Sequence, residues 1–183
     1  MNMKNSNKAV LAIVLILLAA SSRLIDHMAN FTPVLAIAIF GGALLKRQLA
    51  YVLPLAIMLI SDFAIELIRP GEGFYPGQIY VYISFLLVAA LSSGVLRKRN
   101  RQPEWILGTS LGSSLVFFLV SNFGAWVSLP MYEKSFSGLL MCYQNAIPFM
   151  RGEVLSTLLF SGILFGMYHL STAFLFKAAE KRA

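Results

Sequence analysis

Two acidic residues lie inside one of the long apolar stretches of this sequence. Asp62 and Glu66 are four residues apart, which places them on the same face of a helix. Ionisable side chains within a membrane are energetically costly, face the protein interior or a water-filled cavity, and mark functional candidates. Asp62 could accept hydrogen bonds from a ligand or balance the charge of Arg23 or Arg151. The purely structural alternative is a hydrogen bond between helices, or an ion pair with Arg23 or Arg69.

Polar and aromatic residues near the expected outer ends of the apolar stretches extend this candidate site. We expect substrate contacts from Asp62, Tyr80, Asn122, Tyr143 and Arg151, with Arg23, His27 and Asn30 beside them. Arg151 would hold an anionic or amide group, and Tyr80 and Tyr143 would form amphipathic walls. Together these side chains suit a mid-sized ligand that is partly apolar and partly polar.

Cysteine and histidine are scarce in the chain, which limits metal and redox chemistry. The single Cys142 excludes an internal disulfide and any CxxC motif. Thiolate and imidazole both coordinate transition metals, so Cys142 and His27 are candidate cobalt ligands if the substrate is a corrinoid. The alternatives are a small buried cysteine and a hydrogen-bonding histidine near the membrane surface. We expect no resident cofactor or metal.

Residues 108–112 match the GxSxG pattern and offer a catalytic alternative. Ser110 lies near the start of one apolar stretch and His169 near the end of another, so both would lie at a similar depth. A serine and a histidine on adjacent helices could form an intramembrane hydrolase dyad, as in rhomboid-like proteases. The pattern normally acts on a strand-turn-helix elbow, which is absent here, and glycine and serine are also common in membrane helix packing. We therefore expect a protein that is not an enzyme.

The composition is that of a membrane protein. The chain has 183 residues, of which 58% are hydrophobic and 13% charged, and its mean hydropathy is +0.73. A soluble protein has about 25% charged residues, so this chain depends on the bilayer for much of its apolar surroundings. The net charge of +7 comes from residues beside the apolar stretches. It fits contact with anionic lipid headgroups better than a nucleic-acid surface.

The positions of the basic residues predict the orientation of the chain. Lysine and arginine cluster in alternate gaps between the apolar stretches, and eleven of the fifteen fall on one side: Lys4, Lys8, Lys46, Arg47, Arg97, Lys98, Arg99, Arg101, Lys177, Lys181 and Arg182. Positive charge is retained on the cytoplasmic side during insertion. The sequence thus predicts an all-α, polytopic membrane protein, with six spans and both termini in the cytoplasm.

The apolar stretches predict one integral membrane domain over residues 1–183. We expect transmembrane helices at about 8–24, 33–45, 49–67, 79–96, 105–127 and 154–176. The first stretch could be read as a signal peptide, but the topology needs it as a retained helix. The gap at about 128–153 is too long for a simple connection. Its two short apolar segments, 139–143 and 146–150, predict an interfacial helix and a lid over the outer end of the bundle.

The second span is too short to cross a bilayer. Thr32 is a suitable capping residue, and Pro33 suits the first helical position. From there to Lys46 a helix covers only about 20 Å, whereas the hydrocarbon is about 30 Å thick. We expect its outer end to lie below the membrane surface, where its N–H groups would face anything bound above. A tilted neighbourhood or a locally thinned bilayer is the alternative.

Small residues four positions apart mark two helix faces. The pairs are Ala38 with Gly42 in the second span, and Gly108 with Gly112 in the fifth. Such pairs let two helix backbones approach closely in a membrane. We expect close helix packing at both faces.

The order of several short motifs resembles a family of small bacterial membrane proteins that are grouped as transporters without an assigned function. The motifs cover nearly the whole chain: residues 22–25, 27–33 running into 40–43, 54–55, 61–63, 81–82, 121–126, 142–143 and 147–149. That family is similar in size and layout to the substrate-binding S components of energy-coupling factor (ECF) transporters, which import vitamins and metals. Among these, the chain most resembles the cobalamin-specific solitary S components.

The resemblance implies a six-helix bundle in the bacterial inner (cytoplasmic) membrane that captures a scarce nutrient, such as a vitamin-like small molecule, at its outer face. Separate chains, a coupling protein and ATPases, would energise import. The sequence is consistent with this division because it contains no GxxxxGK[ST] loop for phosphates. It departs from the S components in one respect, because the alanines of residues 9–20 do not reproduce their AxxxA contact motif. Docking to an energising partner therefore stays open.

A self-sufficient secondary transporter or channel is the main alternative function. Such proteins usually contain inverted repeats and helices broken near the middle of the membrane. Six spans are compatible with a repeat of three, but the two halves of this sequence are not alike. Pro54, inside the third span, is expected to kink that helix.

Overall fold

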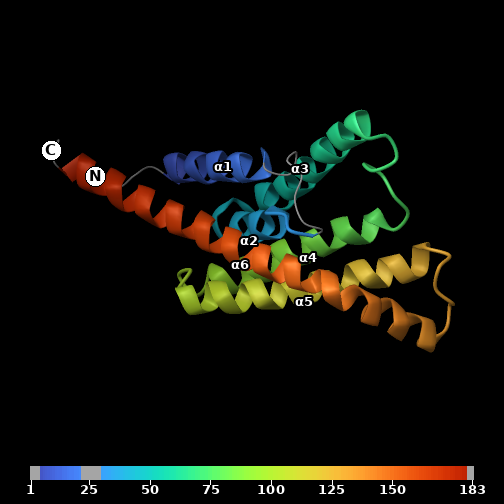
Figure 1. Cartoon of the computed structure of the whole chain (residues 1–183). Helices are drawn as coiled ribbons and strands as arrows, with labels where there is room; N and C mark the ends of the chain where they lie inside the picture. The colour runs from blue at the N-terminus through green and yellow to red at the C-terminus, as the bar shows by residue number, and fades with distance from the viewer. Residues whose placement is uncertain (1–4, 22–29, 181–183) are drawn as a thin grey trace.

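The computed structural model describes residues 5–21 and 30–180, and these residues form six helices without a strand (Figure 1). The helices are α1 (Asn5–Ser21), α2 (Val34–Leu44), α3 (Arg47–Ile68), α4 (Gln78–Leu96), α5 (Pro103–Ser128) and α6 (Phe136–Glu180). The all-α prediction is confirmed for this part of the chain. The first five helices begin and end within about three residues of the expected spans, because charges, glycine and proline interrupt the apolar stretches there.

Helix α2 is the centre of the bundle. Ten of its residues, Val34 to Ala43, are buried, so the helix is surrounded by protein on all sides. Its neighbours are the other five helices. Phe40 packs edge-on against Phe165 and Tyr168 of α6, with ring centroids 5.0 and 5.8 Å apart. A helix that is apolar all round is stable only when buried in this way.

The backbone carbonyls at the end of α2 are satisfied by side chains of α4. The Nε atom of Arg97 donates to the carbonyl of Gly42 at 2.8 Å, and its terminal nitrogen donates to the carbonyl of Leu45. One turn earlier, the hydroxyl of Ser92 donates to the carbonyl of Ile39. A positive group at a helix C-terminus also complements the helix dipole. These bonds allow α2 to end inside the protein.

Close packing between α2 and α4 occurs at Gly42, as its small-residue face predicted. A Cβ atom at Gly42 would lie 2.6 Å from the carbonyl oxygen of Ala89 and 3.0 Å from the Cβ of Ser92. The corresponding prediction for α5 is wrong. Nothing lies within 4 Å of a Cβ at Gly108, and the nearest atom to Gly112 is a leucine methyl at 3.9 Å. This face of α5 is not a site of backbone contact.

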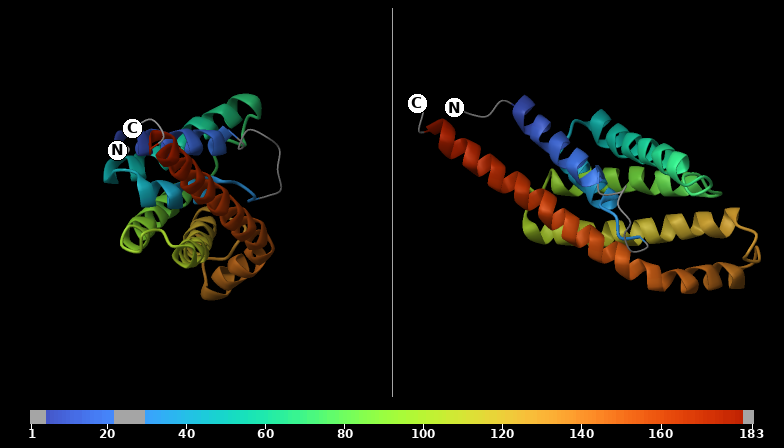
Figure 2. Two further views of the ribbon diagram at one scale, coloured as in Figure 1. Left: turned by 90° about the vertical axis from the view of Figure 1, so that its left-hand side faces the viewer. Right: turned by 45° about the horizontal axis from the view of Figure 1, so that its top comes forward.

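Helix α2 begins deep within the bundle. Figures 1 and 2 show α3, α4, α5 and the first part of α6 extending well beyond the N-terminal end of α2. Pro33 occupies the N-cap position in a helical conformation, and its carbonyl accepts the N–H of Ile37 at 2.9 Å. Among the residues that the structure describes, no side chain caps this end of the helix, so the prediction of a Thr32 hydroxyl cap is wrong. The predicted shortness of the span is confirmed.

Helix α6 is one continuous helix of 45 residues. The predicted interfacial helix and lid are wrong, because residues 139–143 and 146–150 belong to the first four turns of α6. The connection from α5 is short, running from Leu129 to Ser135. Pro148 lies inside the helix and removes one backbone hydrogen bond, which accounts for the bend of α6 in Figure 2.

The exterior of the bundle is that of a membrane protein. Within the described ranges, four helices are long and apolar enough to cross a membrane, namely α3, α4, α5 and residues 136–174 of α6. The apolar parts of α1 and α2 are shorter. Large apolar side chains are exposed along the helices, for example Ile60, Leu67 and Leu170, which are 71%, 85% and 70% exposed. A surface of this kind is stable in lipid and would aggregate in water.

The two ends of the bundle differ in charge. The α2–α3 and α4–α5 turns lie at the end where α6 finishes, and they carry Lys46, Arg47, Arg97, Lys98, Arg99 and Arg101 (Figure 1). We call this the basic end. The opposite end, here the far end, carries the α3–α4 loop and the α5–α6 loop. Those loops contain both acidic and basic residues.

The packing of α2 on α4 gives the first prediction. Gly42→Ala places a methyl group against the backbone of Ala89, so we expect it to destabilise the bundle by about 1–3 kcal/mol. The measurement is the midpoint of heat denaturation of the purified protein in detergent. Gly108→Ala is the matched control, because open space surrounds that position, and its midpoint should stay the same or rise. Equal midpoints for the two variants would contradict the packing.

Candidate functional site

A pocket of about 220 Å³ opens between α4, α5 and α6, next to the segment that leads into α2. Its polar lining consists of Asn30, Ser121, Asn122 and Glu153, and its aromatic lining of Tyr75, Phe117, Phe118 and Phe149. We call it the Glu153 pocket. Typical sites for drug-sized ligands measure about 300–1,000 Å³, so this pocket suits a smaller solute.

Glu153 is the acidic group of this pocket, and one of its oxygens has no partner. The side chain is 6% exposed. Its Oε1 atom accepts hydrogen bonds from the hydroxyls of Ser114 at 3.0 Å and Thr157 at 2.9 Å. Its Oε2 atom is buried and has no hydrogen-bond partner among the residues that the structure describes. A buried carboxylate oxygen without a partner is costly, which points to an occupant that the protein alone does not supply.

Glu153 lies at mid-depth in the bundle. Its partner Ser114 is near the middle of α5, which runs from Pro103 to Ser128. The sequence analysis placed Glu153 at the end of a loop, which is wrong because α6 already begins at Phe136. A signal was nevertheless available, because Glu153 is followed at helical spacing by Ser156, Thr157 and Ser161, which suggests a polar helix face.

Glu153, Ser114 and Thr157 form one polar layer between α5 and α6. A second polar layer lies one helical turn closer to the basic end. The hydroxyl of Ser110 donates to the hydroxyl of Ser161 at 3.2 Å, and both side chains are buried. Ser110 is four residues before Ser114 and Ser161 is four after Thr157, so the two layers follow one another along the α5–α6 contact. Between α5 and its neighbours, the buried hydroxyls of Thr109 and Ser113 have no partner among the described residues.

A larger groove of about 1,940 Å³ lies at the basic end, between α1, α5, α6 and the two turns. Lys46, Arg97 and Arg101 contribute to its lining, as do Ser110 and His169. The two residues of the hydrolase hypothesis thus share a groove. The hydroxyl of Ser110 donates to Ser161 of the second polar layer, and His169 is exposed.

Asp62 connects α3 to α4. The carboxylate is 3% exposed, and its Oδ2 atom accepts hydrogen bonds from Gln78 Nε2 at 2.8 Å and the Tyr82 hydroxyl at 2.7 Å. Gln78 Nε2 also donates to the carbonyl of Gly73 in the α3–α4 loop, at 3.0 Å. These bonds match the structural alternative of a contact between helices. Asp62 does not line the Glu153 pocket, and its contact with a ligand stays a prediction.

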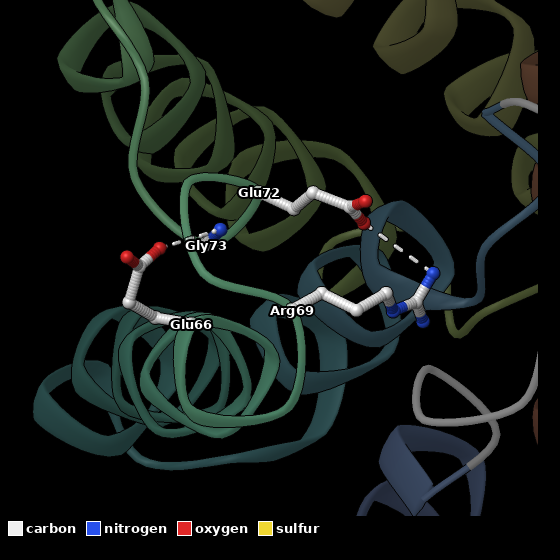
Figure 3. Close-up of polar contacts among 4 residues, drawn as sticks. All are labelled: Glu66, Arg69, Glu72 and Gly73. Carbon is white, nitrogen blue, oxygen red and sulfur yellow. Dashed lines mark hydrogen bonds and ion pairs between the residues drawn. The ribbon is translucent and has the colours of Figure 1, made fainter.

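Glu66 holds the α3–α4 loop at the far end (Figure 3). Its two carboxylate oxygens accept the backbone N–H groups of Gly71 at 2.9 Å and Gly73 at 3.0 Å. A side chain at Gly73 would collide with the backbone of Asp62, since its Cβ would lie 2.3 Å from that carbonyl oxygen. Arg69 and Glu72 form an exposed ion pair at 3.4 Å, which contributes little to stability. Glu66 therefore orders the loop that carries Tyr75.

The predicted substrate residues occupy different places. Asn30 and Asn122 line the Glu153 pocket. Tyr80 packs on Gly124 and on the ring of Phe123, and the Tyr143 hydroxyl donates to the carbonyl of Leu119 at 2.8 Å. Arg151 is exposed and is not part of the pocket lining. Arg23 and His27 lie outside the described residues. For all of these residues, ligand contact stays a prediction.

Cys142 is a buried residue of the α5–α6 contact. It is 2% exposed, and its Sγ atom lies 3.4 Å from the carbonyl oxygen of Asn122, to which it donates. Among the described residues, no group of three histidine, cysteine or acidic side chains could hold a metal ion. This environment is that of the small buried cysteine considered as the alternative to a cobalt ligand.

The two buried carboxylates should respond differently to substitution. Asp62→Ala removes the acceptor shared by Gln78 and Tyr82, so we expect a loss of about 1–3 kcal/mol. Glu153→Gln keeps an acceptor oxygen for Ser114 and Thr157 and removes a buried charge, so we expect an equal or higher stability. Heat denaturation in detergent measures both. A Glu153→Gln variant as unstable as Asp62→Ala would mean that Oε2 has a structural role.

Comparison with known proteins gives one match, which covers nearly the whole chain. No curated protein matches the chain, and no solved structure does. The match is to a family model described as a family of unknown function, DUF6580, and it spans residues 3–179. This fits the expected relationship to a family without an assigned function and adds no link to the S components of ECF transporters. The chain belongs to the DUF6580 family.

Proposed function

We propose that this protein is a membrane transport protein that captures a small solute in the Glu153 pocket. The observation that carries the proposal is that Glu153 lines a pocket and that its buried Oε2 atom has no hydrogen-bond partner among the described residues. Acidic side chains at mid-depth in a membrane bundle typically mark a substrate or ion path. The space between the helices of a bundle is also a common place for a ligand site.

The charge of the two ends supports an outward-facing pocket. Positive charge stays in the cytoplasm, so the basic end is proposed to face the cytoplasm of a bacterial cell and the far end the outside. Basic side chains beside the membrane would also contact anionic lipid headgroups. The Glu153 pocket is lined by residues of the far-end loop, such as Tyr75, and would therefore receive solute from outside.

The layout of the S components offers one way in which such a protein could work. In that arrangement this chain binds the solute, and a separate coupling protein and ATPases supply the energy. The absence of a phosphate-binding loop in the sequence supports this division. The volume of the Glu153 pocket favours a nutrient much smaller than a corrinoid. A vitamin-sized ligand would require the pocket to widen.

A self-sufficient secondary transporter is the second candidate. The observation in its favour is the pair of polar layers between the two cavities. Glu153 lines the Glu153 pocket, and Ser110 and Ser161 line the groove at the basic end. A single helical turn separates the two polar layers. Solute uptake by proteoliposomes that contain only this chain would favour this candidate over the S-component arrangement.

The intramembrane hydrolase has less support. The Ser110 hydroxyl donates to Ser161, and this bond gives Ser110 no general base. Nucleophilic catalysis needs a base within hydrogen-bond reach of the serine. We therefore keep transport as the proposal and a non-enzymatic role for Ser110.

Filling the pocket tests the proposal. The midpoint of heat denaturation of the purified protein is measured with and without each member of a panel of small nutrients, vitamins included. We expect at least one nutrient to raise this midpoint. Ala146→Phe places a ring in the pocket lining and should abolish this stabilisation. Ala90→Phe, on an exposed part of α4, is the matched control and should keep it. Stabilisation that persists in Ala146→Phe would place the site elsewhere, and a panel without effect on the wild type would remove the proposal.

A further inference from the structure

We propose that the solute of the Glu153 pocket is a small organic cation, either a protonated amine or a quaternary ammonium compound with few carbons. The inference rests on the proposed function, because it names the chemical class of the solute for the same pocket. Three features of the pocket lead to it: its charge, its aromatic lining and its size.

The lining combines an acidic side chain with an absence of basic ones among the residues that the structure describes. Among the described residues, the lining contains the carboxylate of Glu153 and no lysine, arginine or histidine. More than nine-tenths of the Glu153 side chain is buried, and both of its hydroxyl partners donate to Oε1. The Oε2 atom thus remains for a ligand. A buried carboxylate is stabilised most by a paired cation, which also compensates its lost hydration.

The aromatic lining suits the apolar part of such a cation. Tyr75, Phe117, Phe118 and Phe149 contribute rings to a pocket that has one acidic group. The face of an aromatic ring carries a negative potential and attracts ammonium groups, including quaternary ones. An anionic or sugar-like solute would find neither basic donors nor a largely polar wall here. The combination of rings and one carboxylate is that of a site for an amphipathic cation.

The size of the pocket and its remaining polar groups narrow the class of cation that it could bind. A pocket of about 220 Å³ admits a compact solute and excludes a large polycyclic cation. The Nδ2 atom of Asn122 donates to the carbonyl of Phe118 at 2.8 Å, which leaves its amide oxygen as an acceptor. Asn30 is a second amide residue of the lining. These acceptors suit the N–H groups of an amine or a hydroxyl on the cation.

The experiment compares ligands that have the same shape but differ in charge. Methylammonium, ethylammonium, tetramethylammonium and choline are titrated calorimetrically into the purified full-length protein in detergent. The neutral isostere of choline, 3,3-dimethyl-1-butanol, is titrated in parallel. We expect saturable binding of at least one cation. If that cation is choline, its neutral isostere should bind at least about tenfold more weakly, because the isostere leaves the buried carboxylate unpaired.

Two variants test the role of the carboxylate. Glu153→Gln keeps the acceptor of the two hydroxyls and removes the charge, so it should weaken binding of the cation by at least about tenfold. Glu104→Gln makes the same chemical change at an exposed residue in the first turn of α5 and should bind like the wild type. For choline, the comparison with its neutral isostere is made on the wild type, so it is decisive even if a variant does not fold. For the other cations, Ala146→Phe should also abolish binding, and binding that persists in this variant would overturn the inference.

The outcomes separate the inference from the proposed function. Cation binding that survives Glu153→Gln, or an isostere that binds as tightly as choline, overturns the inference. It is also overturned if no cation binds while a neutral or anionic nutrient does so in a manner that Ala146→Phe abolishes, and in that case the proposed function stands. If neither the cations nor the nutrient panel bind, both proposals fail.

Discussion

The structure depends on a short buried helix whose backbone hydrogen-bonding groups must find partners without water. Helix α2 has 11 residues and is buried along its length, so at about 1.5 Å per residue it covers about half of a bilayer. Backbone groups left unpaired in an apolar interior are costly. Arg97 and Ser92 therefore donate to its carbonyls, and Gly42 allows α4 to come close enough for these bonds. The other five helices pack around this centre.

The pocket follows from the difference in length between α2 and its neighbours. Helices α3 to α6 continue toward the far end where α2 has not yet begun (Figures 1 and 2). The space beyond it is bordered by α4, α5 and the first turns of α6, with Asn30 and Tyr75 contributed by the adjoining loops. Because Ser114 and Thr157 both donate to one oxygen of Glu153, the other oxygen has no hydrogen-bond partner among the described residues. The same short helix thus explains both the stability of the bundle and its candidate site.

The sequence could predict helices but not all of their partners. Five helices followed from apolar stretches ended by charges, glycine or proline, and the shortness of α2 followed from its length alone. The first turns of α6 were missed because Pro148, Arg151 and Glu153 interrupt the apolar pattern, and a membrane helix tolerates them where neighbours satisfy its polar groups. Asn30 and Asn122 were predicted as polar groups at outer ends. Asp62 accepts hydrogen bonds from Gln78 and Tyr82. These bonds depend on how α4 packs against α3, which no local sequence pattern indicates.

The central claim is that the Glu153 pocket is open to water from outside the cell. The direct measurement is the reaction of Ser121→Cys, in a Cys142→Ala background, with a membrane-impermeant cationic thiol reagent added to intact cells. Ser121 lines the pocket, so the account predicts rapid modification, since thiols ionise and react in water. Leu115→Cys, on the lipid-facing side of the same helix, should stay unmodified. A Ser121→Cys that reacts only from the cytoplasmic side, or not at all, would contradict the account.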